Sequence, residues 1–504
     1  MAFTDPLPLI PSPISATAGQ GRVALAPTAT VHGAPAAAST LIDAVERRTG
    51  FRLPASDRAD DAAISLLVDP ATAGAEGYTL RVADRVEIIG GDEAGLFYGI
   101  QTLLQLLRDG DEGWGWLRAD VADAPRFAYR GVMLDVTRHF FPVAEVKTVI
   151  DRIAALKFNH LHLHLTDDQG WRIQIDSWPL LAEKAAVSAA NGDEGGFYSK
   201  DDFREIVAYA ASRHITIVPE IDLPGHTHAI GVAYPEIVEA PVLNDELVRS
   251  TALWGQKLPV AGEPYTGWGV GHSSVRIREE GTYDFVRDVL TEVGDLTPGP
   301  YLHIGGDESL GTSAEDFAHF VERVSAMVIE LGKTPIAWHE AGAVSGIAQG
   351  TIGQFWGGVE PSEAHAAEAA QFVERGGSLI LSPSNAVYLD MKYDADYPLG
   401  LAWAGLVDVR RAYDWEPTDV LDVPADEILG VEGPLWTETV RSLADAEQLM
   451  FPRIAAVAER AWTPADGAEL TWESFRARLG AMAPLWQADG IRFHPTSEID
   501  WSTR

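Results

Sequence analysis

The sequence of 504 residues contains no cysteine. This absence excludes disulfide bonds and thiolate chemistry, and a zinc site would have to use histidine and carboxylate ligands. Positive charge is also scarce, because 38 lysine and arginine residues stand against 74 aspartate and glutamate residues, for a formal net charge of −36. Nucleic acid and anionic membrane surfaces are therefore not expected as partners, since phosphate binding requires clustered cations.

Long apolar runs are missing as well. No segment approaches the roughly 18 consecutive apolar residues that a membrane-spanning helix needs. The first residues, MAFTDPLPLIPSPIS, contain no basic region followed by an apolar run, so no secretory signal is predicted. We therefore expect a cytoplasmic protein, or a secreted one if a leader has been removed. We also expect a monomer or a homodimer.

The length and the order of the predicted elements indicate two domains. After a proline-rich and extended beginning, residues 1–124 contain short strands and two helical patterns, which predict a small α+β domain. This part contains no acid pair, histidine cluster or phosphate-binding loop, and we interpret it as non-catalytic. The turn Asp123-Ala124-Pro125 marks the boundary, and residues 125–504 form the second domain.

The second domain repeats a pattern of strand, loop and helix. The predicted strands are buried, apolar stretches at 130–136, 160–167, 215–222, 301–308, 334–340, 351–356, 378–383 and 428–436. Eight such strands alternating with amphipathic helices predict an α/β fold, a (β/α)8 TIM-type barrel. A doubly wound open sheet is the competing architecture, but no glycine fingerprint follows the first strand.

Polar and aromatic residues gather where these strands end, which is where barrel enzymes place their active sites. In chain order, the strand ends and the loop after the seventh strand present Asp135, Arg138, Asp167, Asp168, Asp222, His226, Asp307, Glu308, Trp338, Glu340, Trp356, Tyr388, Asp390, Trp403, Trp436 and Glu438. Tryptophan faces stack on sugar rings, whereas carboxylates and arginine bind hydroxyl groups. One arginine among many acids favours a neutral, polyhydroxylated ligand over a phosphate or a carboxylate.

The stretch YLHIGGDESL, residues 301–310, carries two adjacent acids, Asp307 and Glu308, behind a pair of glycines. Neighbouring side chains on a strand point to opposite faces, so two acids that share one pocket are expected to do different jobs. A carboxylic acid surrounded by tryptophan keeps its proton near neutral pH and can act as a general acid. Glycoside hydrolysis requires such an acid at the leaving oxygen. For an isolated Gly-Asp-Glu, a solvated acidic turn would be the simpler interpretation.

The motifs RGVMLDVTRHFFP, HLHLTDDQGWR, PEIDLPGHT, HIGGDES and WTE resemble those of glycoside hydrolase family 20, the β-N-acetylhexosaminidases. The resemblance covers nearly the whole chain. It implies an exo-acting, retaining enzyme that releases terminal GlcNAc or GalNAc from an oligosaccharide or glycoconjugate without metal or cofactor. In this family the nucleophile is the 2-acetamido oxygen of the substrate itself.

The same resemblance implies a role for each site residue. Glu308 corresponds to the general acid and base, Asp307 to the residue that orients the acetamide and stabilises an oxazolinium-like intermediate, and Tyr388 to the donor to the acetamide carbonyl. The pocket walls and hydroxyl contacts correspond to Arg138, Trp338, Trp356, Asp390, Trp403, Trp436 and Glu438. A supporting shell that tunes Glu308 corresponds to Asp167, Asp222 and His226.

Two other functions are compatible with parts of the pattern. His-x-His spacing at a barrel strand can bind a divalent ion, so a metal-dependent hydrolase would use His162, His164, His226 and Asp307. These strand histidines are better interpreted as core residues bonded to neighbouring strands. A glycan-binding barrel without catalysis is the second alternative. The long segment 227–280, rich in aromatic residues that include Trp268, is expected to form a wall on the leaving-group side.

Overall fold

A computed structural model describes residues 7–111 and 113–502. The first six residues of the expected extended beginning lie outside the described part. The chain divides into two compact units. One unit consists of 1–128, 152–158 and 451–504, and the other of 129–151 and 159–450. Each unit has its own sheet.

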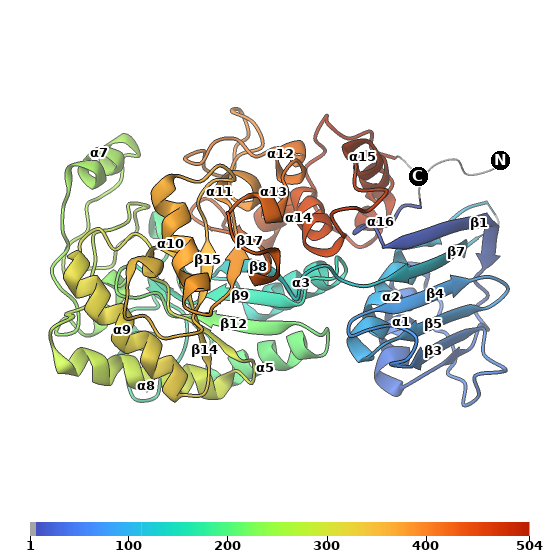
Figure 1. The fold of residues 1–504 in the computed structure, drawn as a ribbon, viewed down its shortest axis with the longest axis horizontal. Helices are drawn as coiled ribbons and strands as arrows, with labels where there is room; N and C mark the ends of the chain where they lie inside the picture. Colours follow the sequence, from blue (N-terminus) through green and yellow to red (C-terminus); the bar gives the residue numbers. More distant parts are fainter. Residues whose placement is uncertain (1–6, 112, 503–504) are drawn as a thin grey trace. The chain divides into compact units, whose positions relative to one another are not determined.

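The first unit contains a mixed seven-stranded sheet, with the order β1-β7-β4-β5-β3-β2 and β6 paired to β7. Its strands are β1 (Ser15–Ala24), β2 (Val31–His32), β3 (Ile64–Val68), β4 (Tyr78–Val82), β5 (Val86–Gly90), β6 (Leu107–Arg108) and β7 (Gly115–Asp123). The helices α1 (Pro35–Thr49) and α2 (Glu93–Gln105) pack together, and α2 lies against β3, β4 and β5 (Figure 1). The predicted α+β domain is confirmed.

The C-terminal helices group with this first unit, which differs from the division expected at residue 124. The buried Asp123 contacts segments of this unit that are far apart in the sequence. Its carboxylate accepts hydrogen bonds from Tyr78 Oη and Lys157 Nζ, both at 2.8 Å, and from Trp462 Nε1 at 2.9 Å. Because an unpaired buried carboxylate is costly, these partners hold distant segments together. The helices involved are α14 (Arg453–Trp462), α15 (Trp472–Gly480) and α16 (Ala483–Ala488).

The second unit is a closed barrel of eight parallel strands, as predicted. In chain order the strands are β8 (Tyr129–Asp135), β9 (His160–His164), β12 (Thr216–Glu220), β13 (Tyr301–His303), β14 (Thr334–Trp338), β15 (Ile352–Phe355), β16 (Leu379–Leu381) and β17 (Ile428–Leu435). Every residue of β8 and β9 is buried, as expected for strands covered on both faces. The short hairpin β10 (Thr166–Asp167) and β11 (Gly170–Trp171) follows β9.

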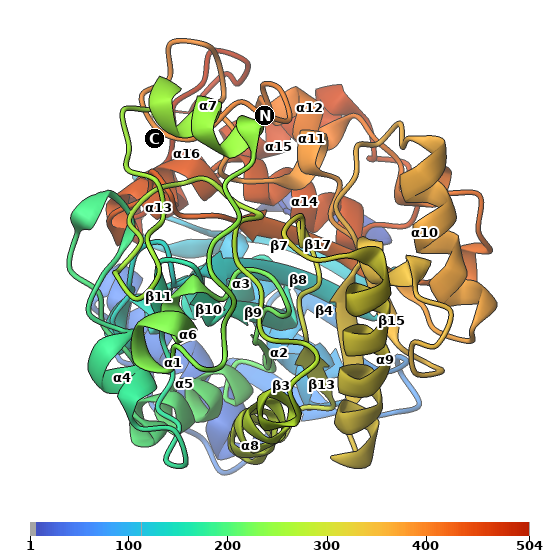
Figure 2. The ribbon, with the colours of Figure 1, turned by 90° about the vertical axis from the view of Figure 1, so that its left-hand side faces the viewer.

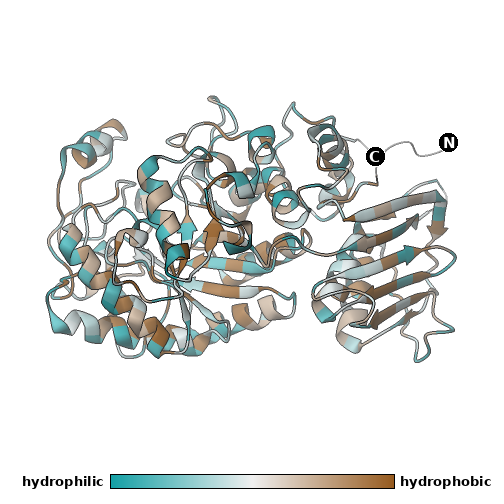
Figure 3. Cartoon of the chain, in the orientation of Figure 1, coloured by the Kyte–Doolittle hydropathy of each residue, from teal (hydrophilic) through white to brown (hydrophobic). Residues whose placement is uncertain are grey.

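Amphipathic helices surround the barrel. They are α3 (Val143–Ala154), α5 (Lys200–Ala211), α8 (Glu280–Leu296), α9 (Ala314–Glu330), α10 (Glu363–Glu374) and α13 (Leu443–Met450). Figure 2 shows α8, α9 and α10 following one another around the outside of the strands. Buried residues in α8 recur every three or four positions, and α8 and α9 carry both polar and apolar positions in Figure 3.

Two local features interrupt the regular alternation of strand and helix. The stretch after β17 forms two helices, α13 and α14, because the ring of Pro452 between them cannot continue the backbone ladder of α13. The long segment 227–280 is not simply a loop. It contains α6 (His228–Ala233) and α7 (Asp245–Leu253), and Asn244 caps α7 by accepting from the Leu247 amide at 2.8 Å.

The small elements that remain are α4 (Leu180–Lys184), α11 (Ser384–Val387), α12 (Val409–Tyr413) and four 3₁₀ turns, η1 (Ala190–Gly192), η2 (His339–Ala343), η3 (Pro417–Asp419) and η4 (Ala425–Glu427). Across 7–111 and 113–502, no helix has the length and apolar character needed to cross a bilayer.

Candidate active site

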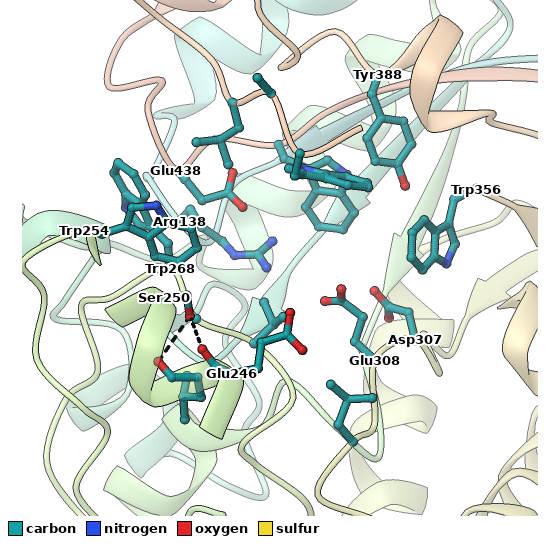
Figure 4. A pocket seen from close by; sticks show the side chains of 18 of the residues that line it. Arg138, Glu246, Ser250, Trp254, Trp268, Asp307, Glu308, Trp356, Tyr388 and Glu438 are labelled. Atoms are coloured by element: carbon teal, nitrogen blue, oxygen red, sulfur yellow. Dashed lines mark hydrogen bonds between the residues drawn. The ribbon is translucent and has the colours of Figure 1, made fainter. Parts of the chain in front are cut away.

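A cavity of about 570 Å³ opens where the barrel strands end. Arg138 follows β8, the pair Asp307 and Glu308 follows β13, and Trp356 follows β15. Further lining residues come from the loops after α11 and β17, namely Tyr388, Trp403, Trp436 and Glu438. Figure 4 shows the carboxylates of Asp307 and Glu308 side by side and pointing into this cavity. The structure therefore brings together eight of the residues predicted from the sequence.

The turn after β13 explains how adjacent acids reach one cavity. β13 ends at His303, so the alternation of a strand no longer applies to Asp307 and Glu308. Gly305 has a φ of +70°, and a Cβ there would lie 1.7 Å from Asp222 Oδ1, so only glycine fits. Glu308 itself has a φ of +46°, a costly conformation for a residue with a side chain. The strained backbone conformation therefore occurs at the predicted general acid itself.

Asp167 lies in contact with three basic side chains, those of Arg138, His164 and His226. Its carboxylate lies 2.8 Å from the Arg138 guanidinium, 2.8 Å from His164 Nε2 and 3.2 Å from His226 Nδ1. Burial alone would raise the pKa of Asp167, but Arg138 and His226 hold that pKa well below its usual range. In the same way, burial opposes protonation of His226, yet the carboxylates of Asp167, Asp222 and Asp307 raise the pKa of His226 well above its ordinary value.

His226 faces the two predicted catalytic residues, Asp307 and Glu308. Its Nε2 lies 3.7 Å from Glu308 Oε2 and 3.8 Å from Asp307 Oδ2. The Glu308 side chain is 35% exposed and borders the cavity. Withdrawal from bulk water raises the pKa of Glu308 to about 7, a rise that His226 opposes and Asp307 supports. Glu308 therefore holds a transferable proton near neutral pH.

This pKa predicts the pH dependence of hydrolysis. A reaction that needs protonated Glu308 should proceed at low pH and lose rate as the pH rises through about 7, whereas an unperturbed glutamate would be ionised above about pH 4.3. The basic limb of kcat/KM should be measured on a substrate with a poor leaving group. A limb near pH 4 to 5 would contradict the assignment of Glu308 as the acid.

Two further carboxyl groups surround Asp307. Burial, reinforced by the charge of Asp307, raises the pKa of Asp222 and of Glu340 well above the usual range. Glu340 accepts the indole N–H of Trp356 at 3.0 Å and so fixes a cavity wall. From the sequence, Glu340 is a strand-end residue without a predicted role. Its position two residues after a predicted wall tryptophan was the available signal.

Not every predicted contact residue lines the cavity. Trp338 is fully buried, donates its indole N–H to Glu220 Oε1 at 2.8 Å, and packs 6.1 Å from the Trp436 ring. Asp390 is also buried, and its Oδ1 accepts the Trp436 amide at 3.4 Å. Both residues contact Trp436, Trp338 through its ring and Asp390 through the Trp436 backbone amide. Asp167, Asp222 and His226 lie outside the lining as well, as a supporting shell would.

Beneath the cavity, buried ionisable residues replace the apolar filling that most barrels have. We call Glu432, His162, Glu220, His164 and Asp167 the interior charge network. Within it, His162 Nδ1 lies 2.9 Å from Glu432 and its Nε2 3.0 Å from Glu220, and His164 links Glu220 at 2.5 Å to Asp167 at 2.8 Å. A hydrophobic cluster in the barrel consists of Tyr129, Val218, Ile336, Ile352 and Ile380, and the Tyr129 hydroxyl donates to Glu432 at 2.6 Å.

The charges in this network alternate in sign. Burial lowers the pKa of His162, but two carboxylates outweigh burial and raise that pKa to about 9. The pKa of His164 is likewise raised well above its usual range. The pKa of Glu220 is held well below its ordinary value, because His164, His303 and His162 outweigh its burial. The histidines were predicted as core residues bonded to neighbouring strands, and these contacts confirm that interpretation. Glu220 and Glu432 were missed.

The residues of the metal-dependent alternative do not meet. His162, His164, His226 and Asp307 fall into separate groups of potential ligands within the described chain, and only His226 and Asp307 share one. His162 and His164 each have both ring nitrogens facing carboxylates of the protein, which occupy the positions that an ion would need.

Comparison with known sequences gives the family. The catalytic-domain model of Glycosyl hydrolase family 20 matches residues 127–465, and the model of its domain 2 matches residues 7–124. The chain belongs to glycoside hydrolase family 20. The two matched regions meet close to the boundary that was predicted from the sequence.

Family 20 relatives resemble this chain over most of its length. A Cellulomonas fimi protein described as beta-N-acetylhexosaminidase is 39% identical over 85% of this chain and 82% of its own. A Porphyromonas gingivalis beta-hexosaminidase is 32% identical over 83% of this chain, which spans about half of that longer protein (54%).

Solved family 20 structures have the same fold. A beta-N-acetylglucosaminidase of the family is 52% identical and superposes with a TM-score of 0.89, over 99% of this chain and all of the other. The Streptomyces plicatus N-acetyl-beta-hexosaminidase, in complex with Thio-NAglucal, is 42% identical with a TM-score of 0.91, and 98% of each chain is covered. A mutant of the latter enzyme was solved with its product, GlcNAc.

Proposed function

We propose that this protein is an exo-acting, retaining β-N-acetylhexosaminidase that removes terminal β-linked GlcNAc or GalNAc. The observation that carries the proposal is the pair Asp307 and Glu308, which project together into one tryptophan-walled cavity beside His226. Family 20 membership supplies the reaction class, and the cavity supplies the acid, a fixed anion and the aromatic walls.

Hydrolysis proceeds in two steps. In the first, Glu308 donates its proton to the glycosidic oxygen while the acetamide oxygen of the bound sugar attacks C1, so the C1–O bond breaks and the leaving group departs as an alcohol. Asp307 accepts the acetamide N–H and balances the positive charge of the resulting oxazolinium-like ring. In the second, Glu308 takes a proton from water as that water attacks C1, and the bond between C1 and the acetamide oxygen breaks, which restores the acetamide and the β configuration.

Two features of the cavity hold the acetamide for attack. Tyr388 is buried, and burial raises its pKa well above the usual range, so its hydroxyl stays protonated and donates to the acetamide carbonyl. The rings of Trp356 and Trp436 bound the space around the amide and the sugar. Positioning of this kind accounts for much of the acceleration available to an internal nucleophile.

The far end of the sugar meets Arg138 and Glu438, which both line the cavity. Arg138 is oriented by Asp135 at 3.4 Å and by Asp167 at 2.8 Å, and its guanidinium lies 4.8 Å from the Trp436 ring. A guanidinium and a carboxyl group together bind two neighbouring hydroxyls, such as O3 and O4. Asp390, which the family resemblance relates to O6, supports this end through the Trp436 backbone.

One assay tests the reaction and its nucleophile together. p-Nitrophenyl glycosides of GlcNAc, GalNAc and glucose should be compared at equal concentration, with an N-acetyl thiazoline as inhibitor. We expect hydrolysis of both acetamido sugars, tight inhibition by the thiazoline, and at least about 10³-fold lower kcat/KM on the glucoside, which has no internal nucleophile. Comparable rates on the glucoside would contradict the proposed function.

A further inference from the structure

One wall of the cavity is held by a residue that does not line it. Trp356 lies one residue past β15 and borders the cavity, whereas Glu340 stands outside the lining. The indole N–H of Trp356 lies 3.1 and 3.0 Å from the two oxygens of the Glu340 carboxyl group. Within residues 7–111 and 113–502, the structure gives this N–H no other acceptor. Because an indole side chain turns about only two bonds, an N–H shared by both oxygens fixes the direction of the ring.

Glu340 belongs to a firmly packed turn. The turn η2, which contains Glu340, begins directly after β14 and lies against α10. Arg375 at the end of α10 donates to the Gly342 carbonyl of η2 at 2.9 Å, and a Cβ at Gly342 would collide with the backbone of α10. The buried His339 places its Nδ1 3.2 Å from Glu340 Oε2 and its ring 5.4 Å from the Trp356 ring. The carboxyl group of Glu340 is therefore a fixed point for the ring.

The wall that Glu340 holds adjoins the residues assigned to the acetamide. Figure 4 shows Trp356 between Tyr388 and Asp307 along one side of the cavity. The Trp403 ring lies 6.0 Å from Trp356 and 5.8 Å from Tyr388, so a continuous aromatic surface joins these two residues. After burial, the charge of Asp307 is the main cause that raises the pKa of Glu340, which places this carboxyl group near Asp307 as well.

The geometry of an amide decides which part of the acyl group meets this wall. In the proposed reaction Asp307 accepts the acetamide N–H and Tyr388 donates to the acetamide carbonyl. In a trans amide the acyl carbon chain lies on the same side of the C–N bond as the N–H. The acetyl methyl group is therefore directed to the Asp307 end of the cavity, where the Trp356 ring forms the wall. Any displacement of that ring changes the space left for the acyl chain.

We infer that Glu340 is a positioning residue for N-acyl selectivity, which holds the Trp356 ring where it leaves room for an acetyl group and none for a longer acyl chain. The inference rests on the proposed function, because it uses the orientation of the bound acetamide. Without the hydrogen bond from Trp356 to Glu340, the ring is free to turn away, and the cavity admits an N-propionyl sugar.

The test compares Glu340→Ala with Glu340→Gln on p-nitrophenyl β-glycosides of N-acetyl- and N-propionylglucosamine. Both substrates have the same leaving group, so protonation by Glu308 affects them equally. The measured quantity is the ratio of kcat/KM for the acetyl over the propionyl sugar. We expect a ratio of at least about 10 in the parent, the usual effect of one methylene in a closed pocket, and a ratio about 5- to 10-fold lower in Glu340→Ala. Glu340→Gln keeps an oxygen acceptor and should stay within about 2-fold of the parent.

Two controls separate positioning from general damage. Glu368→Ala removes a carboxyl group of similar exposure, 28% against 26% for Glu340, which lies 3.9 Å from His339 Nε2 but does not line the cavity. We expect the ratio of the parent in this variant. Trp356→Phe keeps a ring without an N–H donor, and in this background Glu340→Ala should lower the ratio by less than about 2-fold, because the interaction is already absent.

A ratio that is unchanged in Glu340→Ala, or lowered equally in Glu340→Gln, would overturn the inference, since the second result would point to the charge of Glu340 and not to its hydrogen bond. A full effect of Glu340→Ala in the Trp356→Phe background would overturn it too. If thermal unfolding shows that Glu340→Ala does not fold, Glu340→Met, which fills the site without an oxygen, must meet the same expectation. A parent that hydrolyses neither sugar refutes the proposed function and this inference with it, whereas an active parent whose ratio ignores residue 340 refutes the inference alone.

Discussion

Replacing Glu308 with glutamine is expected to lower kcat by about 10²- to 10⁴-fold on chitobiose, because the amide has no proton to give to the leaving oxygen. The loss should be much smaller for a 2,4-dinitrophenyl glycoside, whose phenolate leaves without protonation. Glu308 borders the cavity and lies close to His226, so the substitution changes a proton donor while keeping its shape. The measurement is a plot of log kcat against leaving-group pKa for the parent and the variant.

The slope of that plot shows whether Glu308 protonates the leaving group. We expect a shallow slope for the parent and a steep one for Glu308→Gln, and the basic limb of the pH profile near pH 7 should disappear in the variant. A small loss that is the same for every leaving group would show that Glu308 is not the acid. Thermal unfolding of both proteins controls for damage to the fold.

Replacing Asp307 with asparagine should reduce kcat/KM by about 10²- to 10³-fold, because the developing oxazolinium charge loses the anion beside it. This loss should be similar for good and poor leaving groups, since the acetamide attacks in both cases. The affinity for an N-acetyl thiazoline should fall in parallel, as it does when an interaction is made only in the transition state. Kinetics and inhibition constants measured on the same preparation provide the check.

Asp222→Asn is the matched control for Asp307→Asn. Burial and the charge of Asp307 raise the pKa of Asp222 well above the usual range, which disfavours a charge on this carboxyl group. Its Oδ1 accepts the Gly306 amide at 3.1 Å, which an asparagine oxygen can also do. We expect a loss far smaller than that of Asp307→Asn. Equal losses would mean that the anion at 307 has no special part in catalysis.

The sequence was sufficient for the barrel because its signal is local and repeated. Buried strands such as HLHLH and amphipathic helices such as α8 reveal themselves by spacing alone, and each strand end shows its own polar residues. The sequence therefore predicts that Asp307, Glu308 and Arg138 lie at one rim of the barrel. The grouping of α14 to α16 with the N-terminal unit could not be predicted, because it depends on Asp123 meeting Lys157 and Trp462.

The direction of a side chain at a strand end was harder to predict than its presence. Trp338 is the last residue of β14 and points into the barrel, where it binds Glu220, whereas Trp356, one residue past β15, reaches the cavity. A difference of one position decides between interior and rim. Glu220 and Glu432 were missed because their partners His164 and His162 are 56 and 270 residues away in the chain.

The interior charge network has a consequence for attempts to make this enzyme more robust. Apolar side chains of similar volume are often at least as favourable inside a barrel as a buried ionic set, so rigidifying the interior with leucine or valine would be an obvious engineering route to a higher melting temperature. The same exchange would remove the contact of His164 with Asp167, the carboxylate that also holds His226 opposite Glu308. Heat tolerance and turnover therefore compete for the same few side chains, and selection for one should come at the expense of the other.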